Sequence, residues 1–92
     1  PMPGDSVRVH YKGSLLGGHQ FDSSYKDGNP LAFKIGGTDV IPGLEEGISM
    51  MRQGGKARLI IPSHLAYGDE GYGEIIPPYS TLIFEVELIK VY

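Results

Sequence analysis

Few residues of this chain are of a type that does chemistry, and most of those lack the spacing that a reactive site needs. The histidines, at positions 10, 19 and 64, do not have metal-ligand spacing, so surface or loop placement is the simpler interpretation. Gly55-Lys56 is followed by Ala57, which does not fit a phosphate-binding loop. There is no cysteine, which excludes thiol chemistry and cysteine-bound metals. We therefore expect neither a metal nor a cofactor.

The carboxylates, each taken alone, do not indicate a reactive or metal-binding site either. Glu45 and Glu46 are adjacent and project in different directions, so they suit the first turn of a helix better than an acid/base pair. Asp69-Glu70-Gly71 lacks the spacing of a calcium loop. Asp22, in the run Phe21-Asp22-Ser23-Ser24, by itself indicates a turn in which the carboxylate accepts backbone hydrogen bonds. What remains is a set of aromatic and branched apolar residues near loops.

The elements that would position these residues are mostly strands. Apolar and polar residues alternate over 6–15, 31–35, 56–61 and 82–91, and a period of two over such lengths predicts half-buried strands. Pro62 ends the third of them, because it has no N–H for a ladder bond.

One segment has a helical period instead. Within residues 43–51, Leu44, Ile48 and Met51 are spaced so that they share one helical face. Gly54-Gly55 then supplies a stop at the C-terminal end. The sequence therefore predicts an α+β fold, in which an antiparallel sheet packs its concave apolar face against one short amphipathic helix.

Length and charge limit the possible partners. With 92 residues the chain has room for one core, so we expect a single domain over residues 1–92. The net charge is −3 and no run of Lys or Arg occurs, which disfavours nucleic acid and anionic membranes as partners. No apolar run approaches the ~20 residues that span a bilayer, and no heptad repeat predicts oligomers, so we expect a monomer. The compartment stays open; the cytoplasm is the default expectation, and earlier removal of a targeting segment is an open alternative.

Two long stretches, 16–30 and 63–80, show no period and are predicted to be irregular. Connections of this length in a small domain are usually functional. The second contains Tyr67, Tyr72, Tyr79 and the pair Ile75-Ile76, more apolar surface than a solvated loop should carry. It should therefore fold back on the sheet or border a pocket.

Taken together, six motifs in fixed order resemble one family. They are Val9-His10-Tyr11-x-Gly13, Phe21-Asp22-Ser23-Ser24, Val40-Ile41-x-Gly43-x-Glu45-Glu46-Gly47, Leu65-Ala66-Tyr67-Gly68, Ile75-Ile76-Pro77-Pro78 and Leu82-x-Phe84-x-Val86-Glu87-Leu88. The chain resembles the FKBP-type peptidyl-prolyl cis-trans isomerases, the immunophilins that bind tacrolimus and rapamycin, from about Gly4 to Tyr92. The resemblance implies a half-barrel sheet wrapped around a short helix, with an apolar pocket between them.

The resemblance also implies which residues form that pocket. The ligand-binding set carried over by position is Tyr11, Phe21, Asp22, Val40, Ile41, Leu44, Tyr67, Tyr72, Ile76 and Phe84. Five of them are implied to act in catalysis: Asp22, Tyr67, Phe84, Phe21 and Ile41. The resemblance implies that Asp22 is the family's one buried acid. It also implies that the Ile41 N–H and the Tyr67 hydroxyl donate hydrogen bonds to the ligand.

The chain departs from the best-known members at several positions. Leu44 stands where the pocket floor is commonly Trp, and Leu31 where an aromatic is usual. Tyr72 replaces a frequent His, and Asp27 an Arg that often accompanies the acid. The resemblance implies an N-terminal edge strand, which we expect to be absent from this domain. The change at Leu44 affects the expected rate and drug affinity more than the fold.

The expected function is isomerisation of X–Pro peptide bonds in client proteins, assisting their folding, with macrolides such as tacrolimus and rapamycin as further ligands. Because no bond to carbon or nitrogen is made, the reaction needs no nucleophile, metal or cofactor. The alternative is a non-catalytic module that keeps the FKBP-like fold and holds protein partners.

Overall fold

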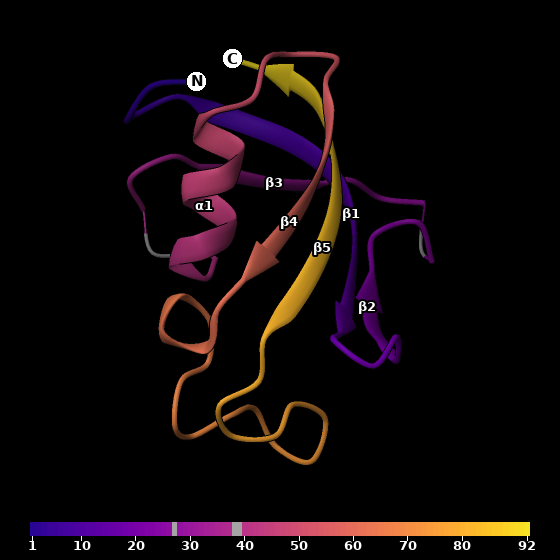
Figure 1. Cartoon of the computed structure of the whole chain (residues 1–92). Helices are drawn as coiled ribbons and strands as arrows, with labels where there is room; N and C mark the ends of the chain where they lie inside the picture. Colours follow the sequence, from indigo (N-terminus) through magenta and orange to yellow (C-terminus); the bar gives the residue numbers. More distant parts are fainter. Residues whose placement is uncertain (27, 38–39) are drawn as a thin grey trace.

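The protein is one antiparallel sheet with a helix against one of its faces (Figure 1). The computed structural model describes residues 1–26, 28–37 and 40–92. Its elements in chain order are β1 (Ser6–Leu15), β2 (Gln20–Ser23), β3 (Leu31–Lys34), α1 (Pro42–Ser49), β4 (Lys56–Ile61), the short 3₁₀ helix η1 (Ser63–Leu65) and β5 (Leu82–Val91). The predicted α+β fold is confirmed.

Strand β1 organises the sheet, whose order is β2-β1-β5-β4 with β3 also paired to β1. The first half of β1 pairs with β3, and the second half pairs with β2. On its other side β1 pairs with β5 over nearly its whole length, from Val7↔Val91 to Leu15↔Leu82. The long β1–β5 pair thus lies at the centre of the sheet, which has one apolar and one polar face.

The apolar face follows from the alternation read in the sequence. Val7 and Val9 are fully buried, whereas Arg8 between them is exposed. On β5 the side chains of Phe84 and Val86 are buried and that of Glu85 is exposed. The buried core is completed from the other elements by Phe33, Ile35, Leu44, Ile48, Ile61, Ile76, Leu82 and Leu88.

Helix α1 packs on this face through two glycines. A Cβ atom at Gly47 would lie 2.5 Å from Cδ1 of Leu59, and one at Gly43 would collide with Cγ2 of Ile61. Glycine lowers intrinsic helix stability by about 1 kcal/mol. Here it lets the helix backbone approach β4 closely, so packing rather than propensity holds this short helix in place.

The predicted helix end at Gly54-Gly55 is wrong. The helix ends at Ser49, and the backbone N–H of Met50 bonds back to the Gly47 carbonyl oxygen. Gly55 instead closes a separate turn on Arg52, with an N···O distance of 2.9 Å. The chain must leave the helix early because it has to reverse direction before β4 begins.

The two stretches predicted to be irregular contain some regular structure. Strand β2 lies inside 16–30 and pairs with β1 across a register shift at Gly13/Ser14. Phe21 is the only apolar residue of this strand, so no alternation was visible in the sequence and the strand was missed. Within 63–80, η1 and a bridge between Tyr72 and Ile76 give local order.

Candidate active site

A cleft opens between the sheet and the start of α1. The start of α1 lies toward the end of the molecule that also carries the segment 63–81 (Figure 1). One hollow of about 230 Å³ is lined by Tyr11, Phe21, Asp22, Leu31, Val40, Ile41, Leu44, Tyr67 and Phe84. A second hollow of about 310 Å³ is lined by Phe21, Asp22, Tyr67, Tyr72, Ile75 and Ile76. They share Phe21, Asp22 and Tyr67 and together form one cleft.

The fold brings all ten residues of the predicted binding set to this cleft. Strand β1 supplies Tyr11, β2 supplies Phe21 and Asp22, and β5 supplies Phe84. The others come from the lead-in to α1, from its first turn and from the long segment before β5: Val40, Ile41, Leu44, Tyr67, Tyr72 and Ile76. Leu31 and Ile75 also line the cleft but were not in the predicted set. The signal for Leu31 was its inward position in the alternation over 31–35, and the signal for Ile75 was the apolar character of its loop.

Three aromatic rings form one wall of the cleft. The Phe84 ring is 5% exposed, and its centroid lies 5.8 Å from that of Phe21 in an edge-to-face arrangement. The Tyr11 ring lies 6.0 Å from Phe84, tilted by 44°. Such aromatic pairs are favourable beyond their buried area.

Gly13 makes this wall possible. A Cβ atom at this position would lie 2.8 Å from Cζ of Phe21 and 3.0 Å from Cε1 of Phe84. Only hydrogen fits there, so Gly13 is a site residue that the predicted set omitted. A glycine inside a strand pattern is the signal that could have indicated it, because it often marks a close approach.

Asp22 is exposed, which corrects the expectation of a buried acid. It lies on β2, at one end of the strand order, where side chains are reached by water. Its Oδ2 accepts a hydrogen bond of 2.7 Å from the Tyr11 hydroxyl, and its Oδ1 accepts one of 2.8 Å from the Ser23 N–H. The carboxylate therefore fixes the Tyr11 ring at the rim of the cleft.

Tyr67 lines both hollows of the cleft. Its side chain is half-buried, and its ring lies 5.2 Å from that of Tyr72. Desolvation raises the pKa of Tyr67 above 10.0, and the proximity of Tyr72 and Asp22 raises it further. The hydroxyl thus keeps its proton at neutral pH and can donate it in a hydrogen bond.

Ile41 offers a backbone donor at the same cleft. Its carbonyl oxygen accepts the N–H groups of Leu44 and Glu45 at 3.1 and 3.2 Å, as expected just before a helix. Across the parts of the chain that the structure describes, no acceptor is bonded to the Ile41 N–H. Below it, Leu44 closes the floor with 4% of its surface exposed.

The far side of the cleft is built by a tight loop. The Tyr72 N–H donates to the Ile76 carbonyl oxygen at 2.8 Å, and Gly71 has a φ of +66°. A Cβ atom at Gly71 would collide with that same carbonyl oxygen. As a result Ile76 is held in the core, while Tyr72 and Ile75 stay half exposed at the rim.

Other site classes find no support in the residues described. Within 1–26, 28–37 and 40–92 no three His, Asp or Glu side chains gather as a metal site would require. None of the helices in these ranges combines the length and apolar character needed to cross a bilayer. Asp27, expected beside Asp22 from the resemblance, lies outside the described residues.

Comparisons with known proteins identify the family. Residues 1–89 match the family described as FKBP-type peptidyl-prolyl cis-trans isomerase. Peptidyl-prolyl cis-trans isomerase FPR2 of Saccharomyces cerevisiae is 53% identical over 91 residues, covering 98% of this chain and 67% of that protein. The FK506-binding protein of Neisseria meningitidis serogroup B is 51% identical, covering 99% of this chain and 84% of its own length.

A solved structure shows the same fold. The crystal structure of AtFKBP13 superimposes with a TM-score of 0.93 at 43% identity, covering 99% of this chain and 82% of that one. The chain belongs to the FKBP-type peptidyl-prolyl cis-trans isomerases, so its activity is rotation about X–Pro peptide bonds.

Proposed function

We propose that the cleft is the active site and that it acts by holding the X–Pro bond in its twisted form. The observation that carries this proposal is the convergence of ten side chains from separate segments on one cleft, most of them aromatic or branched apolar. Rotation about an X–Pro bond must break amide resonance, which sets a barrier of ~18–20 kcal/mol. A site that binds the twisted state more tightly than either planar state lowers that barrier, about tenfold in rate per 1.4 kcal/mol.

Apolar walls suit this task because the twisted amide is less polar than the planar one. On losing resonance its oxygen becomes less negative and its nitrogen more pyramidal. The rings of Phe21, Phe84 and Tyr11 would enclose the proline, with Leu44 beneath it. An apolar cleft stabilises the less polar state relative to water, without any proton transfer.

The polar groups of the cleft then orient the substrate. The Ile41 N–H and the Tyr67 hydroxyl would donate to carbonyl oxygens on either side of the proline. Asp22 orients Tyr11 by accepting a hydrogen bond of 2.7 Å from its hydroxyl. Its negative charge also lies at the rim of the cleft. Its exposure argues against a general-acid role, because nothing surrounding it excludes water.

The same cleft is proposed to bind macrolides of the tacrolimus type. FK506, which is tacrolimus, appears in the name of the Neisseria relative. The rim tyrosines and Ile75 extend the cleft beyond a single proline ring, which gives a larger ligand additional apolar contact. The domain is further proposed to comprise residues 1–92 and to act as a monomer.

The test measures isomerisation of an apolar-Pro peptide by NMR exchange or a protease-coupled assay. We expect a rate above the uncatalysed one, and a decrease of about tenfold for Tyr67→Phe, which loses one hydrogen bond in the transition state. Tyr79→Phe is the matched control, since Tyr79 is 74% exposed and does not line the cleft.

Each outcome has a defined meaning. An unchanged rate in Tyr67→Phe would remove the donor role of Tyr67. No rate at all, in a folded sample that still binds tacrolimus, would favour the non-catalytic binding module; the aliphatic floor at Leu44 is the feature consistent with it. Macrolide binding is read from the backbone amide shifts of Phe21, Ile41, Tyr67 and Phe84, which should move together.

A further inference from the structure

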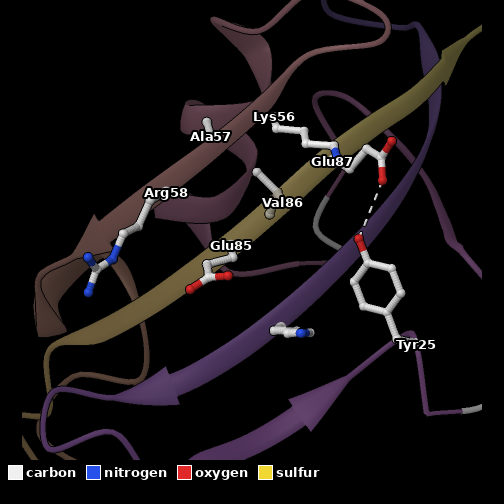
Figure 2. A pocket seen from close by; sticks show the side chains of 8 residues that line it. Tyr25, Lys56, Ala57, Arg58, Glu85, Val86 and Glu87 are labelled. Carbon is white, nitrogen blue, oxygen red and sulfur yellow. Dashed lines mark hydrogen bonds between the residues drawn. The ribbon is translucent and has the colours of Figure 1, made fainter.

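The face of the sheet turned away from the cleft carries an ordered array of charges. Glu85 and Glu87 on β5 point to this face, because Phe84 and Val86 point to the core. In register, Lys56 on β4 lies opposite Glu87, and Arg58 lies opposite Glu85. Figure 2 shows the central row of acids on β5 with the cations of β4 beside it.

Strand β1 repeats the arrangement on the other side of β5. His10 lies opposite Glu87 and Lys12 lies opposite Glu85. The acids therefore form a middle row flanked on both sides by basic side chains. We call this the outer face, defined as the outward side chains of β1, β5 and β4.

An aromatic side chain is fixed across the outer face. The ring of Tyr25 stacks on His10 with centroids 4.5 Å apart and an angle of 16°. Its hydroxyl donates to Oε1 of Glu87 at 3.4 Å (Figure 2), and Nζ of Lys12 lies 5.5 Å from the ring centroid. Nearly half of its surface remains exposed, so the ring is held in place and is still accessible.

Between Tyr25 and β4 the outer face is hollowed. The hollow has a volume of about 440 Å³, and its charged lining comes from Lys12, Lys56, Arg58, Glu85 and Glu87. None of these residues lines the cleft. The two recesses thus lie on opposite faces of the same sheet.

The charge of the outer face is opposite to that of the chain. Five cations, Arg8, Lys12, Lys56, Arg58 and Lys90, stand there against two carboxylates, so the outer face has a net charge of +3. The whole chain carries −3, so the remaining residues carry −6. No run of basic residues reveals this in the sequence, because the cations come from three separate strands.

We propose that the outer face is a docking surface for an acidic segment of a partner protein. Aspartate or glutamate side chains of the segment would pair with the flanking cations, above all Arg58 and Lys56. Hydrogen-bond donors of the segment, such as backbone N–H or hydroxyl groups, would face the middle row of acids. The exposed ring of Tyr25 would give the segment an apolar contact.

The middle row of acids is the reason for choosing a protein segment over a nucleic acid. A phosphate backbone is negative at every nucleotide and would have to pass over Glu85 and Glu87. A peptide can alternate carboxylates with donors and so match rows of opposite sign. Charge complementarity of this kind mainly determines specificity and association rate, and it is sensitive to salt.

Docking at the outer face leaves the cleft free. Consecutive residues of β5, Phe84 and Glu85, point to the cleft side and to the outer face respectively. A client bound through an acidic segment could therefore present a proline from another part of its chain. Such tethering raises the effective concentration of that proline without any new contact in the cleft.

The test uses a labelled peptide in which Asp and Glu alternate with Ser and Tyr and which contains no proline. Fluorescence anisotropy at low salt should show binding that weakens as salt is added, and an Asn/Gln version of the peptide should not bind. Arg58→Gln should weaken binding about threefold to tenfold, as expected for loss of a partly exposed charge pair. Glu85→Gln should strengthen it, because one repulsive charge is removed.

Arg52→Gln is the matched control, since Arg52 is an exposed arginine in the turn before β4. It should change binding by less than about twofold. All three variants should retain the isomerase rate of the unaltered chain, because none of these residues lines the cleft. Equal weakening by Arg52→Gln and Arg58→Gln would overturn the proposal, because it would show general charge attraction only. Tighter binding of a single-stranded oligonucleotide of equal charge, or no binding of the acidic peptide, would overturn it as well.

Discussion

The two sides of β5 show how one strand serves two chemistries. Toward the cleft it presents Phe84, almost completely buried and packed on two other rings. Toward solvent it presents Glu85, exposed between Lys12 and Arg58. The cleft depends on close apolar packing and the outer face on charge placement, so changes at neighbouring residues should affect different properties.

The largest expected effect separates the two sides directly. Phe84→Ala should lower the free energy of unfolding by about 3–5 kcal/mol, because it removes a buried ring and leaves a cavity. Glu85→Ala, one residue away, should change it by about 0.5 kcal/mol or less, as for most exposed positions. Urea unfolding of both variants measures the difference, and similar losses would mean that the outer face is as tightly packed as the cleft.

A smaller effect is expected from two glycines in the loop that closes the cleft. Both Gly71 and Gly73 have positive φ, at +66° and +56°, so alanine is strained at either position. Only at Gly71 would the new Cβ atom meet backbone, including the Pro77 carbonyl carbon at 2.9 Å. Gly71→Ala should therefore be less stable than Gly73→Ala by about 1–3 kcal/mol.

The readout for this pair is thermal or denaturant unfolding together with the isomerase rate. Gly71→Ala should also slow isomerisation, because Ile76 and Tyr72 on either side of the loop line the cleft. Equal stability and equal rates in the two variants would show that the loop adapts freely and does not shape the cleft.

The smallest expected effect is a pH dependence of stability, to which one tyrosine in the cleft and one on the outer face contribute. Desolvation raises the pKa of Tyr67 in the cleft and of Tyr25 on the outer face above 10.0, with Asp22 contributing to the first and Glu87 to the second. A raised pKa means that the folded state binds the phenol proton more tightly than the unfolded state. The stability from both groups is therefore present below pH 10 and is lost as the pH rises through the raised values.

Absorbance titration of the phenols checks this, with Tyr67→Phe and Tyr25→Phe assigning each transition. Both midpoints should lie above that of a free tyrosine. Added salt should lower the Tyr25 midpoint more, because Tyr25 is more exposed and salt weakens the effect of the nearby Glu87 and Glu85 charges there. A Tyr67 midpoint at or below the free value would contradict its partial burial in the cleft.

The sequence predicted the elements that show a clear period. The strands at 6–15, 56–61 and 82–91 are confirmed at their boundaries. In an alternating strand of six or more residues, only one face can be buried, because a shift of one residue would turn all the apolar side chains to solvent. Strand β2 was missed because Phe21 is its only apolar residue, and its pairing with β1 is not visible in the sequence. The helix end was placed too late because the turn at Arg52 and Gly55 depends on where β4 begins.

The candidate site was predicted through a resemblance in six motifs and not from any single residue. That set converges in the cleft, but the exposure of Asp22 differs from the expectation. Gly13 was left out, since its role depends on two rings that lie far from it in the sequence. Side-chain exposure and close approach are properties of neighbours in space, which a motif does not specify.

By itself the sequence determined the family, the alternation of the long strands and the residue types available for the cleft, because these are encoded locally along the chain. The tertiary structure alone decided how close α1 comes to β4, where Asp22 meets water, and that five scattered cations share one face. The physical reason is that strand pairing joins residues far apart in the chain, and it fixes which charges and rings become neighbours.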